Sequence, residues 1–433
     1  MKFEKKRLGD IAQIIGGGTP STKVSEYWDG DIAWLTPKDL SSFDGIYVAR
    51  GSRSVTEAGL AASSAKMLPK ASVLYTSRAP IGYVAIAEGA ISTNQGFKSL
   101  VLKEGYVPEF LFYLLKASKT EIESHASGGT FAEISAKAFS DVELYFPPTK
   151  YQSKVADILL GLDEKIQTNK QLSKTLEDIA QTIFKSWFID FDPVKAKMAG
   201  EKPVGMDAAT AALFPDSMED SELGFIPTAW AVRELGDVLL TIESGKRPKG
   251  GSQSSGVPSL GAESIRGLGE FDFSSTKFIP HVFYAGMPTG KVKPFDVLIY
   301  KDGAGAGSYV SMFGGNFPFA EYAINEHVFL LRANQIPQSY LYFWMNLDSQ
   351  KRLMVELAQK SAQPGLNQKD MKSISTLVPS TEILNTFDNL MKPFIAQIMS
   401  NSAENQTLSK IRDALLPRLI SGELQIPEEM LTS

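Results

Sequence analysis

The sequence predicts a mixed α/β (α+β) fold in which two β-rich globular domains accompany two long antiparallel coiled-coil helices, with an internal pseudo-two-fold repeat. Three observations support this prediction. Short motifs of residues 1–148 return in the same order in residues 229–379, and each copy is followed by a long amphipathic helical pattern. The chain of 433 residues is also too long for one ordinary core.

The repeat starts with a short motif near the beginning of each copy. The residues RLGDI at 7–11 return as ELGDV at 234–238, and a Gly-containing turn follows in both places. Later landmarks keep their order: VLY at 73–75 and VLIY at 297–300, the loops TSRAPIG and KDGAGAG, the segments STNQGFKSLVL and INEHVFLLR, the aromatic stretches PEFLFYLLK and QSYLYFWMN, and the prolines Pro147-Pro148 and Pro379. The order predicts two copies of one domain-plus-helix module.

The strongest helical patterns follow the prolines, because apolar residues recur there at steps of three and four. The expected seams are Val155, Leu159, Leu162, Ile166, Asn169, Leu172, Leu176, Ile179, Ile183 and Trp187, and Ile383, Phe387, Leu390, Phe394, Ile398, Asn401, Asn405, Leu408, Ile411, Leu415 and Leu419. A polar residue such as asparagine within an apolar stripe can fix the register of paired helices. A single amphipathic helix often simply packs on a core. Two matched copies favour helices that cover each other, each of about 38 residues and roughly 57 Å long.

These patterns give the expected domain boundaries. The segment 188–228 carries prolines, glycines and acidic residues without sustained periodicity, which indicates an ordered-to-flexible linker. We therefore expect a first globular domain at 1–148, a first long helix at 149–187, an acidic linker at 188–228, a second globular domain at 229–379, a second long helix at 380–422 and a C-terminal tail at 423–433.

Composition is that of an ordinary globular protein, with 43% hydrophobic and 21% charged residues. The absence of cysteine excludes disulfides and thiolate metal sites, and no apolar stretch predicts a signal peptide or a membrane span, so we expect a cytoplasmic protein. The formal net charge of −5 does not exclude a nucleic-acid partner, because the acidic excess lies in one segment. The segment 188–228 holds three lysines and eight acids, so the rest of the chain is balanced and can carry basic faces.

Motifs for catalysis are missing. The three histidines, His125, His281 and His327, are far apart in sequence and form no H-E-x-x-H motif, so we expect no metal site. The run Gly303–Gly307 follows an expected strand but lacks the G-K-[ST] ending of a phosphate loop, which favours a flexible turn. Pro147-Pro148 follows Phe146, where an amino-methyltransferase motif needs a hydrogen-bonding residue, and no G-x-S-x-G elbow occurs. The sequence thus predicts a non-catalytic chain that binds no cofactor itself.

The loops instead carry side chains suited to nucleic-acid grooves. Cations such as those at 246–249 suit phosphates or guanine edges, and amide side chains read adenine. Each of these residues can equally be a solvated loop residue or a turn-former, and their recurrence in corresponding loops favours the functional interpretation. The candidate DNA-binding residues are Thr19, Ser21, Lys38, Arg78, Asn94, Gln95, Lys98, Thr130, Lys246, Arg247, Lys249, Lys301, Asn325, His327, Gln363 and Asn367.

Several motifs together resemble the specificity subunits of type I restriction-modification systems, over essentially the whole chain. They are RLGDIAQIIGGGTPST at 7–22, YW at 27–28, IAWLTPKDL at 32–40, TSRAPIGYVAI at 76–86, SGGTFAEISAKAF at 127–139, IFKSWFIDFDPV at 183–194, PDS at 215–217 and DSELG at 220–224. The resemblance implies two target recognition domains that each read half of a split double-stranded DNA site. It also implies that the paired helices hold these domains apart and dock two methyltransferase subunits, and that restriction/translocase subunits join the complex.

In that family S-adenosylmethionine, ATP and magnesium would be bound by partner subunits. The second copy departs from the pattern, because SGKRPKGGS replaces GGTPS and KDGAGAG lacks the arginine and proline of TSRAPIG. This divergence suits two domains that read different half-sites, contacting major-groove segments about one helical turn, roughly 34 Å, apart. Two other hypotheses stay open at this point: a duplicated protein-binding adaptor with a coiled-coil spacer, and a self-sufficient methyltransferase or nuclease.

Overall fold

The computed structural model describes residues 3–128, 132–271, 275–315, 319–360 and 363–432. The chain forms two compact units: unit 1 contains residues 1–167 and 408–433, and unit 2 contains residues 168–407. The division falls within both long helices, so each unit consists of a globular part and one half of each helix. Each unit is described by itself below.

Unit 1 contains a five-stranded sheet, a three-stranded sheet and one strand pair. Its strands are β1 (Glu4–Arg7), β2 (Ala12–Gly16), β3 (Trp28–Leu35), β4 (Tyr47–Val48), β5 (Arg53–Val55), β6 (Val73–Ser77), β7 (Ile81–Ala87), β8 (Ser92–Thr93), β9 (Lys98–Leu102) and β10 (Glu143–Phe146). The sheet orders are β2-β9-β6-β7-β4 and β5-β3-β8, and β1 pairs antiparallel with β10. Strands β3 and β8 are parallel neighbours.

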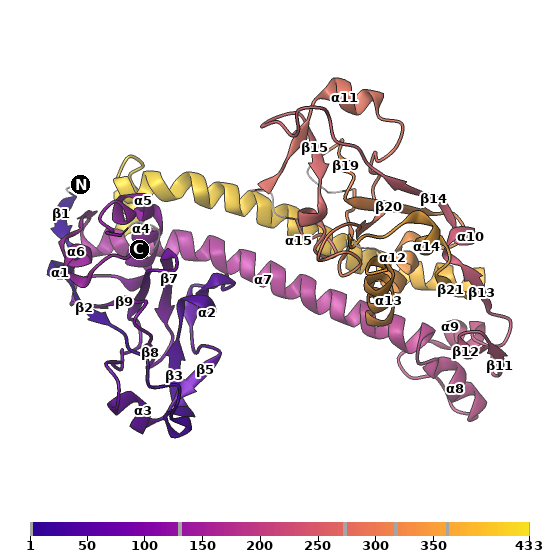
Figure 1. Ribbon diagram of the computed structural model, residues 1–433, viewed down its shortest axis with the longest axis horizontal. Helices are drawn as coiled ribbons and strands as arrows, with labels where there is room; N and C mark the ends of the chain where they lie inside the picture. The colour runs from indigo at the N-terminus through magenta and orange to yellow at the C-terminus, as the bar shows by residue number, and fades with distance from the viewer. Residues whose placement is uncertain (1–2, 129–131, 272–274, 316–318, 361–362, 433) are drawn as a thin grey trace. The chain divides into compact units, whose positions relative to one another are not determined.

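Short helices cover these sheets. They are α1 (Leu8–Ile11), α2 (Pro37–Ser41), α3 (Glu57–Ala61), α4 (Pro108–Ala117), α5 (Lys119–Glu123), α6 (Ala136–Asp141) and α16 (Glu428–Thr432). Pro108 starts α4, where its missing N–H costs nothing, and the run from Phe110 to Leu115 is buried throughout. Helix α4 packs on β6 and β7 (Figure 1), so this aromatic helix closes the core of unit 1.

Unit 2 repeats the same arrangement of strands. They are β11 (Met218–Ser221), β12 (Gly224–Pro227), β13 (Ala231–Glu234), β14 (Leu239–Ser244), β15 (Val257–Leu260), β16 (Phe278–Ile279), β17 (Val297–Tyr300), β18 (Val310–Met312), β19 (Ala323–Ile324), β20 (Val328–Ala333) and β21 (Ser375–Val378). The sheet orders are β14-β20-β17-β18 and β16-β15-β19, and β13 pairs with β21. These orders match those of unit 1, including the parallel pair of β15 with β19, except that β4 has no counterpart in the four-stranded sheet and the β11-β12 pair has none in unit 1.

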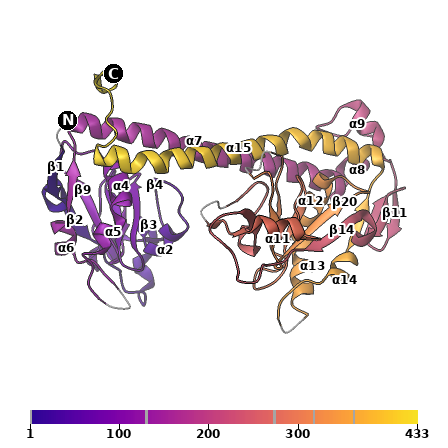
Figure 2. The ribbon, with the colours of Figure 1, turned by 90° about the horizontal axis from the view of Figure 1, so that it is seen from above.

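The helices of unit 2 are α8 (Asp192–Met198), α9 (Ala208–Leu213), α10 (Leu235–Val238), α11 (His281–Gly286), α12 (Gln338–Asn346), α13 (Asp348–Ala358) and α14 (Gln368–Lys372). Helix α12 packs on β17, β18 and β20, as α4 does on its own sheet (Figure 2). Its aromatic residues are buried, and the Tyr340 hydroxyl donates to the Leu377 carbonyl over 2.7 Å. This bond satisfies the one polar atom of a fully buried ring.

Two long helices, α7 (Thr149–Phe188) and α15 (Thr381–Ser421), contribute to both units. In unit 1, Tyr151 donates to the Leu424 carbonyl and Arg412 pairs with Asp163. In unit 2, the ring of Phe184 lies 5.5 Å from that of Phe387. Residue numbers fall along α15 as they rise along α7, so the two helices run antiparallel within each unit (Figures 1 and 2).

The helices lie where the apolar pattern predicts them, but the expected seam is only partly buried. The residues Leu172, Ile179, Leu390 and Ile411 are 38–43% exposed. The neighbouring face of α7 is buried instead, through Ala180, Phe184 and Phe188, because it packs on the aromatic residues of α12. We expected the two helices to cover each other, and the structure adds that each helix also covers a globular core.

The segment 188–228 does not behave as the linker that we expected. It forms α8, α9 and the hairpin of β11 with β12. Its residues Val194, Phe214 and Ile226 are buried in the core of unit 2, where Phe214 packs edge-on against Trp187. Periodicity could not indicate this, because each element is too short to show a repeating pattern. The acidic segment is thus part of the folded core of unit 2.

Candidate nucleic-acid interface

Loops at the strand ends of unit 1 are joined into one cluster by their backbones. Loop cluster 1 consists of residues 17–21, 77–80, 94–96 and 132–134. Four backbone hydrogen bonds hold it: Gly18 N to Thr93 O (2.9 Å), Asn94 N to Leu35 O (2.9 Å), Ser77 N to Gly96 O (2.7 Å) and Ile134 N to Ser77 O (3.0 Å). Since these bonds involve no side chains, the side chains of the cluster can vary without loss of this frame.

Unit 2 contains the same frame. Loop cluster 2 consists of residues 245–249, 301–303, 325–327 and 364–366. Its bonds are Gly245 N to Asn325 O (3.2 Å), Asn325 N to Leu260 O (2.9 Å), Lys301 N to His327 O (2.9 Å) and Leu366 N to Lys301 O (2.9 Å). Three of the four bonds join equivalent residues of the two units, and the bond of the first loop is shifted by one residue at its donor and its acceptor. Positions in one cluster can therefore be matched to positions in the other.

An asparagine forms the same turn in each cluster. Asn94 Oδ1 accepts a hydrogen bond from the Gly96 amide, and Asn325 Oδ1 accepts one from the His327 amide, both over 2.8 Å. Asn325 is also only 5% exposed. Their carboxamide oxygens hold an Asx turn, a local structural role that the prediction of adenine contacts did not include. The residue between asparagine and amide, Gln95 or Glu326, takes the middle of each turn.

A glycine permits the close approach of two loops in each cluster. A Cβ atom on Gly17 would overlap the carbonyl oxygens of Thr93 and Asn94, and one on Gly245 would overlap the carbonyl oxygen of Ile324. Any other residue would push the first loop away from the asparagine turn. The glycines in GGGTPST and SGKRPKGGS thus have a shared packing role.

The side chains of loop cluster 1 form a neutral pair and an ionic group. The hydroxyl of Thr19 donates to Oε1 of Gln95, and both residues are exposed. Glu133 accepts from Arg78 at 3.3 Å and from Lys98 at 3.4 Å, and Lys98 also reaches the Ser77 hydroxyl at 3.4 Å. Six of the predicted residues therefore lie in or beside one cluster: Thr19, Ser21, Arg78, Asn94, Gln95 and Lys98. A carboxylate holds its two cations.

Loop cluster 2 carries more charge. Arg247 Nε lies 3.1 Å from Oε1 of Glu326, and Nε2 of His327 lies 3.4 Å from the same oxygen. Nδ1 of His327 lies 3.4 Å from Asp302, which Lys301 contacts at 3.1 Å. The structure thus brings Arg247, Lys301 and His327 together around two carboxylates.

Three acidic residues of these clusters were missed in the sequence. Glu133, Asp302 and Glu326 each contact a predicted cation, yet only cations and amides were considered among the loop side chains. A signal was present, because Asp302 directly follows Lys301 and Glu326 lies between Asn325 and His327. Acids next to predicted DNA-binding cations can hold those cations in position and can also accept hydrogen bonds from cytosine.

Ser21, Lys246 and Lys249 belong to the first loops of the clusters, whereas Lys38, Gln363 and Asn367 lie outside the clusters. The Ser21 carbonyl accepts from Trp28 Nε1, Lys38 is exposed on α2, and Lys246 and Lys249 are exposed beside Arg247. Asn367 caps α14, its Oδ1 accepting from the Asp370 amide over 2.9 Å, so it has a local structural role that the prediction did not include. Gln363 is exposed, and Thr130 lies outside the described residues.

Sites for catalysis or metal binding were not expected, and the described residues contain no cluster of three or more acidic or histidine side chains able to hold a metal ion. In the Gly303–Gly307 run, the amides of Gly303, Ala306 and Gly307 donate to the carbonyls of Pro364, Gly303 and Tyr300. These three amides are bonded within the protein and hold the run in a turn.

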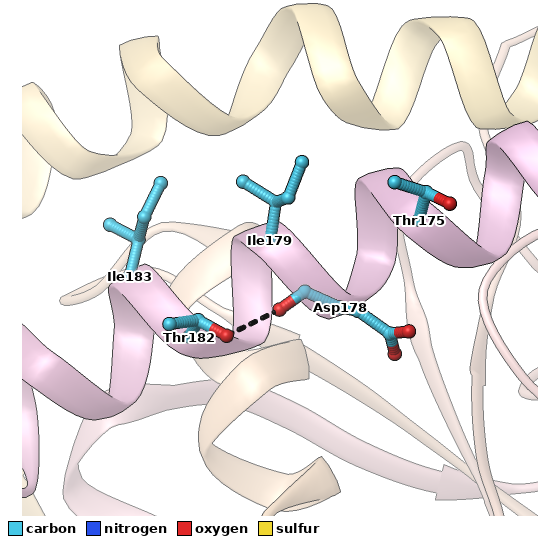
Figure 3. A pocket seen from close by; sticks show the side chains of 5 residues that line it. All are labelled: Thr175, Asp178, Ile179, Thr182 and Ile183. Atoms are coloured by element: carbon cyan, nitrogen blue, oxygen red, sulfur yellow. Dashed lines mark hydrogen bonds between the residues drawn. The ribbon is translucent and has the colours of Figure 1, made fainter.

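A shallow hollow of about 300 Å³ lies on α7 in unit 2, lined by Thr175, Asp178, Ile179, Thr182 and Ile183 (Figure 3). The Thr182 hydroxyl donates back to the Asp178 carbonyl over 2.8 Å, and Ile179 and Ile183 point toward α15. All five residues belong to one helix and include no nucleophile paired with a base. Within the described part of the chain, no helix has the length and apolar character needed to cross a membrane.

Comparison with known proteins identifies the family. Residues 1–178 match the model of the type I restriction modification DNA specificity domain. The chain is 32% identical over 432 residues to the type I restriction enzyme MjaIX specificity subunit of Methanocaldococcus jannaschii, covering 98% of this chain and 94% of that one. It is 29% identical to the HindI specificity subunit of Haemophilus influenzae, over 73% of this chain and 78% of the relative.

A solved structure has the same fold. The S subunit of a type I restriction-modification system from M. genitalium aligns with a TM-score of 0.61 at 16% identity, covering 97% of this chain and 96% of that one. At this identity the likeness concerns the fold alone, and the family assignment depends on the sequence relatives. Together with the two loop clusters, these relatives establish that the chain belongs to the family of type I restriction enzyme specificity subunits.

Proposed function

We propose that this chain is the DNA-reading subunit of a type I restriction-modification complex and that each loop cluster reads one half of a bipartite target. Members of the family are non-catalytic recognition subunits, and this chain is one of them. Methylation and cleavage would be carried out by two methyltransferase subunits and by restriction/translocase subunits in the cytoplasm. S-adenosylmethionine, ATP and magnesium would be bound by those partners.

One observation carries this proposal: the two clusters share a backbone frame and differ in their side chains. Three equivalent backbone bonds, a fourth shifted by one residue, and two Asx turns recur, while Thr19 and Gln95 are replaced by Arg247 and Glu326. A shared frame with different polar groups is what two readers of unlike sequences require, since base identity is read by side chains at the groove edges.

The charges of both clusters suit a polyanion. Arg78 and Lys98 in cluster 1, and Arg247 and Lys301 in cluster 2, lie beside loops that also present amide or carboxylate groups. The exposed Lys246 and Lys249 extend the positive charge and suit phosphate contacts. Phosphate contacts would set the position of each unit on the duplex, and the polar side chains would select bases.

We propose that the chain is an internal duplication with pseudo-two-fold symmetry and that α7 and α15 form an antiparallel coiled coil. The corresponding strand orders of the two units support the duplication. The proposed recognition domains are 1–148 and 229–379. The proposed spacer helices, 149–187 and 380–422, have ends within one residue of those of α7 and α15. The segment 188–228 joins the second domain, and 423–433 is the tail.

Methylation mapping tests the proposal. The chain is expressed with its methyltransferase subunit in a host without adenine methylation, and modified positions are mapped with and without the chain. We expect one two-part motif that appears only with the chain. The purified complex should also lose affinity for duplex DNA steeply between low and moderate salt. Methylation without any sequence motif, or binding that is equal on all duplexes, would contradict the proposal.

A further inference from the structure

Two side-chain pairs occupy the same place in the two clusters. Gln95 and Glu326 are the middle residues of the two Asx turns. Each contacts a residue in the first loop of its cluster: Gln95 contacts Thr19, and Glu326 contacts Arg247. Thr19 and Arg247 each lie two residues after the matching glycine, Gly17 or Gly245. The pair Thr19–Gln95 therefore corresponds to the pair Arg247–Glu326.

Neither pair is needed to hold its cluster together. The frame is made by backbone bonds and by the carboxamides of Asn94 and Asn325. Thr19 and Gln95 are exposed, and the side chains of Arg247 and Glu326 are 50% and 38% exposed. Oε2 of Glu326 is buried without a hydrogen-bond partner, so Oε1 is the oxygen that a base can reach. Polar side chains that stand outside the frame and reach solvent are available to contact a ligand.

The side chains of the two pairs suit different DNA base pairs. A glutamine amide makes two hydrogen bonds to N6 and N7 of adenine, and a threonine methyl group packs on the methyl group of thymine. An arginine makes two hydrogen bonds to O6 and N7 of guanine, and a glutamate accepts from the N4 amino group of cytosine. Because Arg247 contacts Glu326 through Nε, its terminal amino groups can be directed at one guanine.

The carboxylate of Glu326 is informative, because a negative charge is repelled by phosphates and weakens general affinity for DNA. Arg247 and His327 both contact Oε1 of this carboxylate. This arrangement compensates the charge and fixes the side chain at the tip of the turn. A held carboxylate in a cationic loop contributes selectivity through the cytosine amino group, at some cost in affinity.

Resting on the proposed function, we propose that the Thr19–Gln95 pair reads an A·T base pair in the first half-site and that the Arg247–Glu326 pair reads a G·C base pair in the second. The two half-sites then differ at corresponding positions because the two pairs differ. The four residues are specificity-determining residues, and the phosphate contacts of Lys246 and Lys249 carry no such information.

Exchange of the pairs tests this inference. The variant Arg247→Thr/Glu326→Gln gives unit 2 the pair of unit 1, and Thr19→Arg/Gln95→Glu does the reverse. Each is assembled with its methyltransferase subunits, and its methylated motif is mapped. We expect one position of the second half-site to change from G·C to A·T in the first variant, with the first half-site unchanged. Discrimination at that position in duplex binding should change about 5- to 150-fold, from about 1–3 kcal/mol per bidentate contact.

The single variants Lys246→Ala and Lys249→Ala are the matched controls, since they remove exposed cations of the same loop. They should weaken binding to all duplexes alike and leave the motif unchanged. If the double variant supports no methylation, the single variant Glu326→Gln is mapped instead. Relaxed selection at one G·C position supports the inference, and unchanged selection overturns it. An unchanged motif in the exchanged variants would overturn the inference and leave the bipartite function standing. A parent complex without a bipartite motif would instead overturn the proposed function itself.

Discussion

Asn169 on α7 donates a hydrogen bond from Nδ2 to Oδ1 of Asn405 on α15, over 3.0 Å. The two asparagines begin the matching motifs NKQLSK and NQTLSK, so equivalent residues of the two repeats meet each other. Around them Asn401 donates to the Asn169 carbonyl at 3.3 Å and to the Ser173 hydroxyl at 3.0 Å. Within unit 2 this polar layer joins the two helices in one register.

Replacing Asn169 tests that layer. Asn169 is 2% exposed, and Asn169→Ala removes the donor to both Asn405 and Glu404. We expect a loss of about 1–3 kcal/mol in the free energy of unfolding, because buried polar groups lose their partner. Urea unfolding followed by circular dichroism measures it. Lys174→Ala, at an exposed position further along α7, is the control and should change little; equal effects of the two substitutions would contradict the role of the layer.

The glycine at the approach of two loops gives a second prediction. Gly17→Ala should destabilise the protein by about 1–3 kcal/mol, because the new Cβ overlaps two backbone carbonyl oxygens that cannot move independently. It should also impair reading of the first half-site. A Cβ atom on the neighbouring Gly16 would meet open space, so Gly16→Ala is a matched control with little effect. Thermal unfolding and motif mapping measure both effects. If Gly17→Ala and Gly16→Ala behaved alike, the packing role of Gly17 would be contradicted.

A half-buried carboxylate, that of Glu177, makes the stability of unit 2 depend on pH. Burial raises the pKa of Glu177 above its ordinary value, although the Tyr342 hydroxyl donates to it over 2.8 Å. A raised pKa in the folded state stabilises the protein fully below the unfolded pKa and loses that contribution as pH rises through the folded pKa. Glu177→Gln keeps an acceptor for Tyr342 and carries no charge.

The Gln variant should therefore have a higher Tm than the parent at pH 8, and the difference should shrink as the pH is lowered toward about 5. Differential scanning calorimetry across this range measures the effect. Asp178→Asn, at the exposed neighbouring position, should show no such trend. A Tm difference for Glu177→Gln that grows with falling pH would show that the ionised form is the favoured one.

The ion pair of Asp296 and Arg332 predicts a larger effect. Arg332 donates to both carboxylate oxygens, at 2.7 and 2.5 Å, and Asp296 is 2% exposed. Arg332→Met should cost about 3–5 kcal/mol in unfolding free energy, since it leaves a buried charge without its partner. The double variant Arg332→Met/Asp296→Leu should lose clearly less. Additive losses in a double-mutant cycle would show that the two side chains act independently.

The long helices could be predicted well because their evidence is local. Apolar residues recur at steps of three and four along both helices, interrupted only by the asparagines of the seams, and the helices end within one residue of the expected limits. The direction in which each residue faces was harder to infer. Ile179 was assigned to the seam and is 42% exposed, because α7 also packs on α12, and only the fold brings α12 there.

The loops show the opposite situation. Arg78, Lys98, Arg247 and Lys301 were predicted as binding residues, and the structure gathers them into two clusters. The roles of Asn94 and Asn325 could not be predicted, because an Asx turn and a base contact require the same residue type. Glu133 could not be found from the sequence, because its cation partners Arg78 and Lys98 are distant in sequence and only the fold brings them beside it.

The central claim is that the two loop clusters read two different halves of one target. Its most direct test is the methylated motif of complexes that carry Arg78→Ala or Lys301→Ala, each substitution removing one cation from a different cluster. The account predicts that each variant relaxes base selection in one half-site only, and that the two variants affect opposite halves. Relaxation of the same half by both variants, or of both halves by either one, would contradict it.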